Sequence, residues 1–153
     1  MGGISRTWLV WPAAFALLAW AGLCLAAEGY KGWERGGSYN RLYDPDKAVT
    51  IKGRVVRTAE VVPMAGMDPG LALIVKTAQG EEIEVQLGPK PFAKSIAGAF
   101  SPGAQAKAKG VWAEIGGRKV FMAAKVRLEE FRDFKLRLTK DGYPAWDYKG
   151  LWQ

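Results

Sequence analysis

Five stretches of the chain have the apolar character of β-strands, and several of them alternate apolar and polar residues with the period of two that is typical of strands with one buried face. The first stretch, Ala48–Val61, places Val49, Ile51 and Val55 on one side of an extended backbone. The other four predicted strands are Leu71–Thr77, Glu82–Leu87, Ala104–Ile115 and Val120–Leu128. The pattern therefore predicts a mainly β fold.

One short helix is predicted between the third and fourth strands, because Phe92, Ile96 and Phe100 recur at the spacing of a helical face. Three strands, a helix and two strands is the order of a small five-stranded OB-like barrel. Gly53 supports this fold, since a glycine inside a long first strand permits the coiling or bulge that lets one strand serve both halves of a barrel.

The N-terminus is predicted to be a signal peptide, residues 1–27. Arg6 precedes an uninterrupted apolar run, residues 8–27, and cleavage after Ala26 would leave small residues at the positions that the peptidase reads. The run is also long enough for a bilayer core of about 30 Å, so an uncleaved membrane anchor stays open, as does lipidation at Cys24. The protein is expected to be periplasmic or otherwise exported.

Three further segments follow. Residues 28–47 are rich in glycine and have no period, so they are predicted to be a flexible arm. Residues 48–130 form the predicted barrel. Residues 131–153 are an aromatic C-terminal extension that is expected to pack on the barrel, with residues such as Tyr143 and Trp146 covering apolar surface.

Composition bears on function by exclusion. After Ala27 the chain has no cysteine and no histidine, which excludes disulfides, thiol nucleophiles, zinc sites and imidazole bases. Lys94 and Ser95 are adjacent on the predicted helix and point apart. Glu82 and Glu84 lie about 7 Å apart beside a turn, where solvated acids are ordinary. We therefore expect no enzyme and no cofactor.

Charge indicates an anionic partner. The chain has 22 basic and 15 acidic residues, and about +6 remains after Arg6 is removed. OB barrels bind nucleic acid or sugar with basic groups and stacking aromatics on one sheet face. The residues predicted for such a face, with Trp112 as a further stacking candidate, are Lys52, Arg54, Lys107, Lys109, Phe121, Lys125 and Arg127. The expected partners are an anionic polymer (nucleic acid, acidic glycan or lipid headgroups) or an envelope protein. The alternative is a solvated face whose lysines protect exposed strand edges.

A methionine pair gives the second functional hypothesis. Met64 and Met67 lie in one predicted loop, and thioethers bind Cu(I), so a metal or redox accessory factor is the alternative function. Simple packing over the barrel mouth explains the same residues. A structural subunit of an envelope complex is the third possibility.

Several motifs carry a family resemblance over residues 42–146. They are the first strand with Gly53, the loop from Pro63 to Met67, the strand end Val85-Gln86-Leu87-Gly88-Pro89, Lys109-Gly110 and the tail Asp141-Gly142-Tyr143-Pro144-Ala145-Trp146. In these the chain resembles small exported bacterial OB-fold proteins of unassigned function, which are often loosely labelled nucleic-acid-binding. The resemblance implies a binding or accessory module and specifies no activity.

Overall fold

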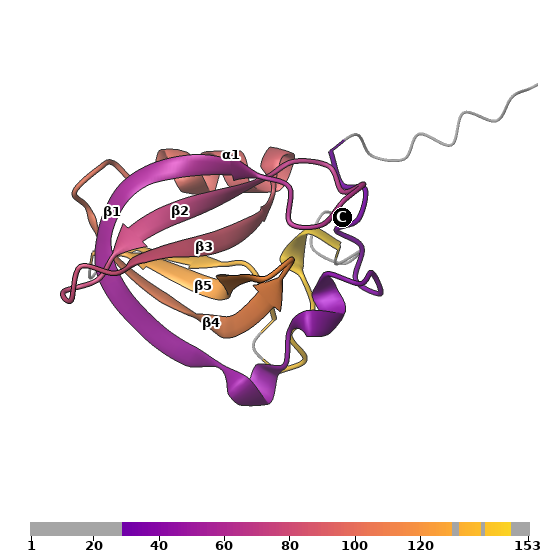
Figure 1. The fold of residues 1–153 in the computed structure, drawn as a ribbon. Helices are drawn as coiled ribbons and strands as arrows, with labels where there is room; N and C mark the ends of the chain where they lie inside the picture. Colours follow the sequence, from indigo (N-terminus) through magenta and orange to yellow (C-terminus); the bar gives the residue numbers. More distant parts are fainter. Residues whose placement is uncertain (1–28, 130–131, 139, 148–153) are drawn as a thin grey trace, which may run out of the picture.

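The computed structural model describes residues 29–129, 132–138 and 140–147, which form one six-stranded sheet with a short helix beside it (Figure 1). The strands are β1 (Val49–Val61), β2 (Gly70–Lys76), β3 (Glu82–Pro89), β4 (Gln105–Ile115), β5 (Arg118–Leu128) and β6 (Arg132–Lys135). Helix α1 (Lys90–Gly98) lies between β3 and β4, and three short 3-10 turns are η1 (Asn40–Leu42), η2 (Pro45–Lys47) and η3 (Ala145–Asp147). The predictions of a mainly β fold and of a helix between the third and fourth strands are confirmed.

The predicted signal peptide, with Cys24, lies outside the described residues. Within the described ranges, no helix has the length and the apolar character needed to cross a membrane.

The sheet curves back on itself. Its neighbours run in the order β3-β2-β1-β4-β5-β6, and all of these pairs are antiparallel. In addition, β3 pairs in parallel with β5, where Val85 meets Phe121 and Gln86 meets Met122. This contact joins both ends of the run from β3 to β5, so five strands surround a common interior and β6 extends the sheet beyond β5.

Strand β1 belongs to two pairings along its length. Its first half, up to Arg54, pairs with β4, and its second half pairs with β2 from Arg54 onward. Gly53 lies at this changeover, where a Cβ would stand 2.4 Å from the carbonyl oxygen of Lys76 and 2.6 Å from a methyl group of Val75. Glycine is therefore required by the close approach of β2, and the bulge expected in this strand follows between Val55 and Arg57.

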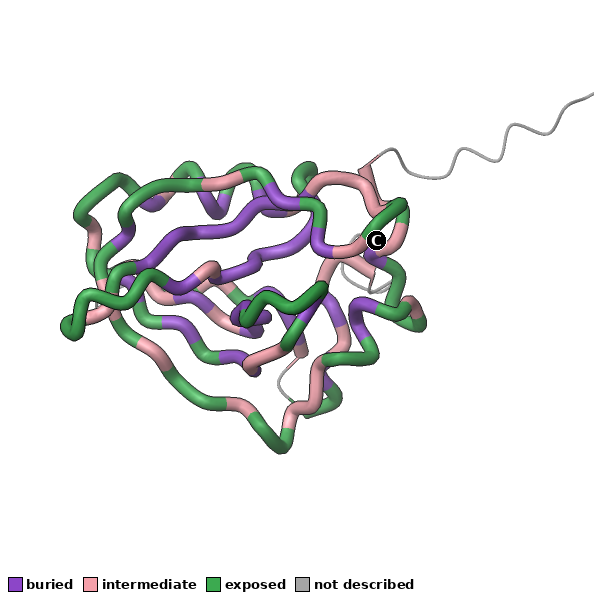
Figure 2. The backbone as a smooth tube through the Cα atoms, viewed as in Figure 1, coloured by how far each residue is buried: buried purple, intermediate pink, exposed green. Residues whose placement is uncertain are grey.

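The interior of the curved sheet is the main hydrophobic core. Leu73, Val85, Phe121 and Val126 are fully buried in it. Helix α1 packs on this cluster through Ala93, Ile96 and Ala97, next to β2 and β3. Figure 2 shows the buried backbone concentrated on the inner strands, with exposed residues along the outer course of β1 and in the turns.

A second hydrophobic cluster lies around Trp33 and Tyr39, which are 0% and 1% exposed. They pack against Val111, Val120 and Met122, and the Trp33 indole donates to the carbonyl oxygen of Asp68 at 2.8 Å. Residues 28–47 were predicted to be a flexible arm, whereas the described part of this segment supplies two of the most buried aromatic side chains.

The described part of the C-terminal extension packs on the same region. Trp146 lies edge-on to Trp33, with ring centroids 5.8 Å apart, and its indole donates to the carbonyl oxygen of Trp33 at 2.8 Å. Its ring also contacts Phe92, which joins the extension to α1. The guanidinium of Arg137 is buried between the rings of Tyr43 and Trp146, at 4.6 and 5.2 Å from their centroids.

Candidate anion-binding site

Three cations form a row across the outer face of the sheet. Lys52 on β1 is directly opposite Lys107 on β4, and Lys107 is opposite Arg127 on β5. Opposed residues of an antiparallel pair have Cβ atoms about 5 Å apart and point to the same side. The row ends at β6 with Asp133, the register partner of Arg127.

A second row lies two residues further along the strands, on the same face. It runs from Thr50 on β1 through Lys109 on β4 and Lys125 on β5 to Lys135 on β6. Three of its four members are lysines. The cations of the two rows, together with Arg54 two residues beyond Lys52 on β1, give a basic face, which we define as Lys52, Arg54, Lys107, Lys109, Lys125, Arg127 and Lys135.

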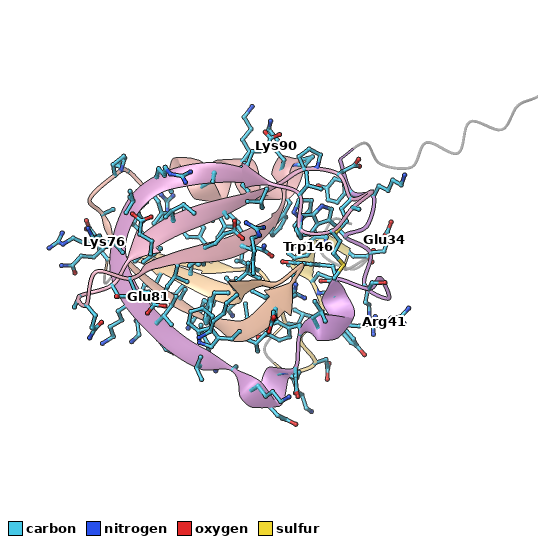
Figure 3. The ribbon with its side chains drawn as sticks, viewed as in Figure 1. Glu34, Arg41, Lys76, Glu81, Lys90 and Trp146 are labelled. Atoms are coloured by element: carbon cyan, nitrogen blue, oxygen red, sulfur yellow. The ribbon has the colours of Figure 1, made fainter. Side chains whose placement is uncertain are left out.

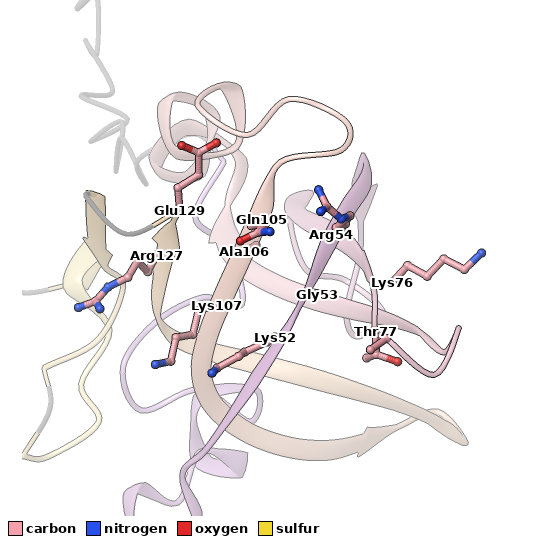
Figure 4. Close-up of a pocket in the computed structure, with 11 residues that line it drawn as sticks. Lys52, Gly53, Arg54, Lys76, Thr77, Gln105, Ala106, Lys107, Arg127 and Glu129 are labelled. Atoms are coloured by element: carbon pink, nitrogen blue, oxygen red, sulfur yellow. The ribbon is translucent and has the colours of Figure 1, made fainter.

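A cavity of about 740 Å³ opens at one end of the basic face. Its floor is formed where β1 passes from β4 to β2, and the end of β2 and the residue after β5 form its sides (Figure 4). The residues that line it are Lys52, Gly53, Arg54, Lys76, Thr77, Ala78, Gln105, Ala106, Lys107, Arg127 and Glu129. Five of these side chains are cationic and one is anionic, so the cavity attracts anions.

Asp133 neutralises one side of the basic face. Its carboxylate accepts from Arg127 at 2.5 and 3.0 Å, and it lies 3.6 Å from the ammonium of Lys125. The hydrogen bonds from Arg127 lower the pKa of Asp133 from its ordinary value of 3.8 to about 2. Asp133 therefore remains ionised at any physiological pH.

The other side of the face has no such compensation. Among the residues that the structure describes, no carboxylate lies within 4 Å of the ammonium of Lys52, Lys107 or Lys109. Like charges directly opposite in a sheet are destabilising. Since the pair Lys52 and Lys107 has this arrangement without a neutralising neighbour, an anion placed between them would relieve the repulsion.

Phe121 is a correction to the predicted site. It is 0% exposed and packs edge-on against Trp112 in the interior, with ring centroids 5.1 Å apart, so it has no place on the basic face. The reason is a register shift in the pairing of β4 with β5. Lys109 pairs with Lys125 and Gly110 with Ala123, which leaves Ala124 as an extra residue. The bulge reverses the alternation, and the side on which Lys125 lies is not the side of Phe121.

The other stacking candidate also lies away from the cavity. Trp112 is half-buried near the turn between β4 and β5, and the ammonium of Lys119 lies 4.3 Å from its ring centroid. No aromatic side chain lines the cavity in the described part of the chain.

The methionine loop lies against the second hydrophobic cluster. Met64 and Met67 are both half-buried and pack on the group that contains Trp33. Met67 also covers Gly32, where a Cβ would approach its side chain to 2.4 Å. These contacts give both thioethers a packing role, and their binding of a metal stays a prediction.

Glu82 and Glu84, the two acids noted in the sequence, have different surroundings. Glu84 lies 3.6 Å from Arg118 and accepts from Gln86 at 3.0 Å, whereas Glu82 is exposed at the start of β3. Gln86 follows these two acids at a spacing of two along β3 but is 1% exposed, because Tyr39 covers it and donates to its side-chain oxygen at 2.7 Å.

Four polar or charged side chains of the cavity were not predicted: Lys76, Thr77, Gln105 and Glu129. They lie at the ends of strands, and only the pairing of β1 with both β2 and β4 brings them together. Gln105 alternates with Lys107 and Lys109 along β4, so the period-two pattern already contained it. No local pattern indicated Glu129, which follows β5.

Two comparisons with known proteins add to this geometry. The model of the MamS/MamX magnetosome protein family matches residues 47–131, which contain β1 to β5 and the whole cavity. No curated protein sequence matches the chain.

Proposed function

Because this chain belongs to the MamS/MamX magnetosome protein family, we propose that it acts at the magnetosome as an exported, non-enzymatic module that recognises an anionic polymer through its basic face. The family match spans the strands that carry this face. The proposal of export rests on Arg6 and the apolar run of residues 8–27.

We assign the curved sheet to the OB-like barrels. In support, three strands precede the helix, β4 and β5 follow it before the added strand β6, and a parallel contact between β3 and β5 joins the ends of the five-stranded run. OB barrels bind oligonucleotides and oligosaccharides on the face of strands 2 and 3 and on adjoining loops. Here the basic residues Lys52 and Lys107 lie on β1 and β4 instead, so the proposal of binding rests on their charge and on the cavity beside them.

The opposition of Lys52 and Lys107 is the observation on which the proposal depends. A lysine-rich surface serves solubility equally well when its charges are dispersed. Two ammonium groups on adjacent strands, with Arg54 and Arg127 around the same cavity, instead concentrate positive charge at one place. Such a concentration lowers stability slightly and raises the affinity for anions.

Binding measurements test this function. The full chain, purified as the cell processes it, is titrated with oligothymidylate, polygalacturonate and phosphatidylglycerol vesicles at low and at physiological ionic strength. Binding to at least one probe should weaken steeply with salt, because polyanions release counterions when they are bound.

Two double charge reversals serve as the test variant and its control. Lys107→Glu with Lys109→Glu should abolish the binding, whereas Lys94→Glu with Lys140→Glu changes the net charge equally at exposed positions outside the basic face and should retain most of it. Absence of binding to all three probes, or equal losses in both double variants, would overturn the proposal.

A further inference from the structure

Glu129 is the acidic residue of the cavity, and its backbone is held in an unusual conformation. Its φ of 52° lies in the left-handed region, and within the described ranges no other residue except glycine has a positive φ. Residues other than glycine rarely adopt this conformation, because it brings the Cβ close to the following carbonyl oxygen. The backbone N–H of Glu129 donates to the carbonyl oxygen of Gln105 at 3.0 Å, which fixes it beside the start of β4.

The carboxylate of Glu129 makes no ion pair inside this basic cavity. In the described part of the chain, no lysine or arginine nitrogen lies within 4 Å of it, although five cations line the same cavity. Figure 4 shows it at the opposite side from Lys52, Lys107 and Thr77. A negative charge that does not neutralise its neighbours weakens the attraction for any polyanion. For ligand binding, its presence is favourable where the ligand offers it a hydrogen bond.

The chemistry of the ligand follows from the groups that can donate a hydrogen bond to Glu129. An ionised carboxylate is an acceptor only, so the ligand must present N–H or O–H groups to it. A ligand ammonium is disfavoured by the five cations of the cavity. Neutral O–H and N–H groups are the remaining donors, and the side chains of Thr77 and Gln105 offer further hydrogen bonds to a hydroxyl-bearing ligand.

The absence of aromatic lining argues in the same direction. Proteins that bind single-stranded nucleic acids combine a basic groove with aromatic rings on which the bases stack. The described residues of this cavity include no aromatic side chain, and Phe121 is buried elsewhere. A polymer that carries anionic groups and hydroxyls, without bases, matches the lining better.

We propose that the anionic polymer is an acidic polysaccharide, whose acid groups bind between Lys52 and Lys107 and whose hydroxyls donate to Glu129. This inference rests on the proposed function of the basic face and specifies the class of its ligand. The two charges of opposite sign in one cavity then have separate roles: the cations supply affinity, and the carboxylate selects for sugar over other polyanions.

The variant Glu129→Gln separates these roles because it removes the charge and keeps the size of the side chain. Binding of the full chain is measured with polygalacturonate, inorganic polyphosphate and oligothymidylate. For polygalacturonate the loss of a charged acceptor should weaken binding about tenfold. For the other two polyanions, which offer the carboxylate no sugar hydroxyl array, removal of a repulsive charge should strengthen binding. Glu114→Gln, at an exposed position of β4 outside the cavity, should leave all three affinities within about twofold.

The outcomes are distinguishable. Opposite changes for polygalacturonate and polyphosphate support the inference, and retained polyphosphate binding shows at the same time that the variant folds. Stronger binding of all three polymers by Glu129→Gln would show that Glu129 only repels, which overturns the polysaccharide assignment and leaves the anion-binding function intact. A preference of the unmodified protein for oligothymidylate would overturn it in favour of nucleic acid. Failure of the unmodified protein to bind any polymer would overturn both proposals.

Discussion

Lys52 and Lys107 stand directly opposite each other on β1 and β4, and within the described residues neither ammonium has a carboxylate within 4 Å. On the same face Arg127 and Lys125 share Asp133. The basic face is therefore compensated at β6 and uncompensated at β1. This asymmetry places the strongest attraction for anions at the cavity.

Reversal of one charge at the uncompensated end should stabilise the fold. Lys52→Glu replaces a repulsive pair with an attractive one, and the free energy of unfolding should rise by about 0.2–1 kcal/mol at low ionic strength. Urea denaturation measures this change. The gain should shrink as salt screens the pair. Lys94→Glu, on the exposed side of α1, is the control for net charge, and an equal gain there would contradict the explanation.

Asp133 should stabilise the fold and weaken the binding of polyanions. Its pKa in the folded protein is about 2, below the ordinary 3.8, so its contribution to stability is present above pH 3.8 and is lost as the pH falls toward 2. Asp133→Asn should lower stability at neutral pH and should make the decline between about pH 4 and 2 shallower. The same variant leaves Lys125 and Arg127 without their shared carboxylate, so polyanion binding should become tighter. Denaturation at several pH values and a titration with polyanion check the two effects, and weaker binding would contradict the role of Asp133.

The buried hydroxyl of Tyr39 should be important for packing the N-terminal segment. Tyr39→Phe leaves the side-chain oxygen of Gln86 without its donor at a fully buried position, which should cost about 1–3 kcal/mol. Burial also raises the pKa of Tyr39 above its ordinary value of 10, so the phenol stays protonated in the folded protein. Stability should therefore decline as the pH rises above 10, and less steeply in the variant. Tyr143→Phe, at a partly exposed ring that stacks on Arg35, should cost under about 0.5 kcal/mol. Equal costs for the two variants would be evidence against the buried network.

Gly53 should tolerate no side chain. In Gly53→Ala the new Cβ would stand 2.4 Å from the carbonyl oxygen of Lys76, and the strands have to separate at the point where β1 changes partners. The expected loss of stability is about 1–3 kcal/mol, and thermal denaturation measures it. Gly36→Ala meets no atom within 4 Å and should change stability far less. A harmless Gly53→Ala would mean that β1 and β2 do not approach this closely.

Much of the fold could be predicted from period-two patterns because strands such as β4 alternate buried and exposed residues, although β2 is buried on both sides. The alternation of Lys107 and Lys109 with small buried alanines indicated the outer face of β4, and the structure places both lysines there. The same period-two pattern gave the wrong side for Phe121 on β5. There the extra residue Ala124 reverses the alternation, so Phe121 points into the interior. A single bulge of this kind leaves no local signal in a strand whose residues are apolar on both sides.

The cavity was harder to predict than the face. Lys76 and Glu129 lie far apart in the chain and come together only through the partner change of β1 and the pairing of β4 with β5. The buried positions of Trp33 and Tyr39 were also not evident from a glycine-rich segment. Val111, Val120 and Met122 gave one indication of this burial. These apolar residues do not belong to the main core, so another segment of the chain has to cover them. Figure 3 shows this covered end, at Glu34 and Trp146, on the opposite side of the molecule from Lys76 and Glu81.

Amide chemical-shift mapping of the protein with a polyanion tests the central claim most directly. During titration with polygalacturonate, the shifts should concentrate at Lys52, Gly53, Ala106 and Lys107, around the cavity at the uncompensated end of the basic face. The perturbations should disappear in the Lys107→Glu/Lys109→Glu variant. Shifts centred on the loop of Met64 and Met67, or spread evenly over the exposed lysines, would contradict the assignment of the basic face as the binding site.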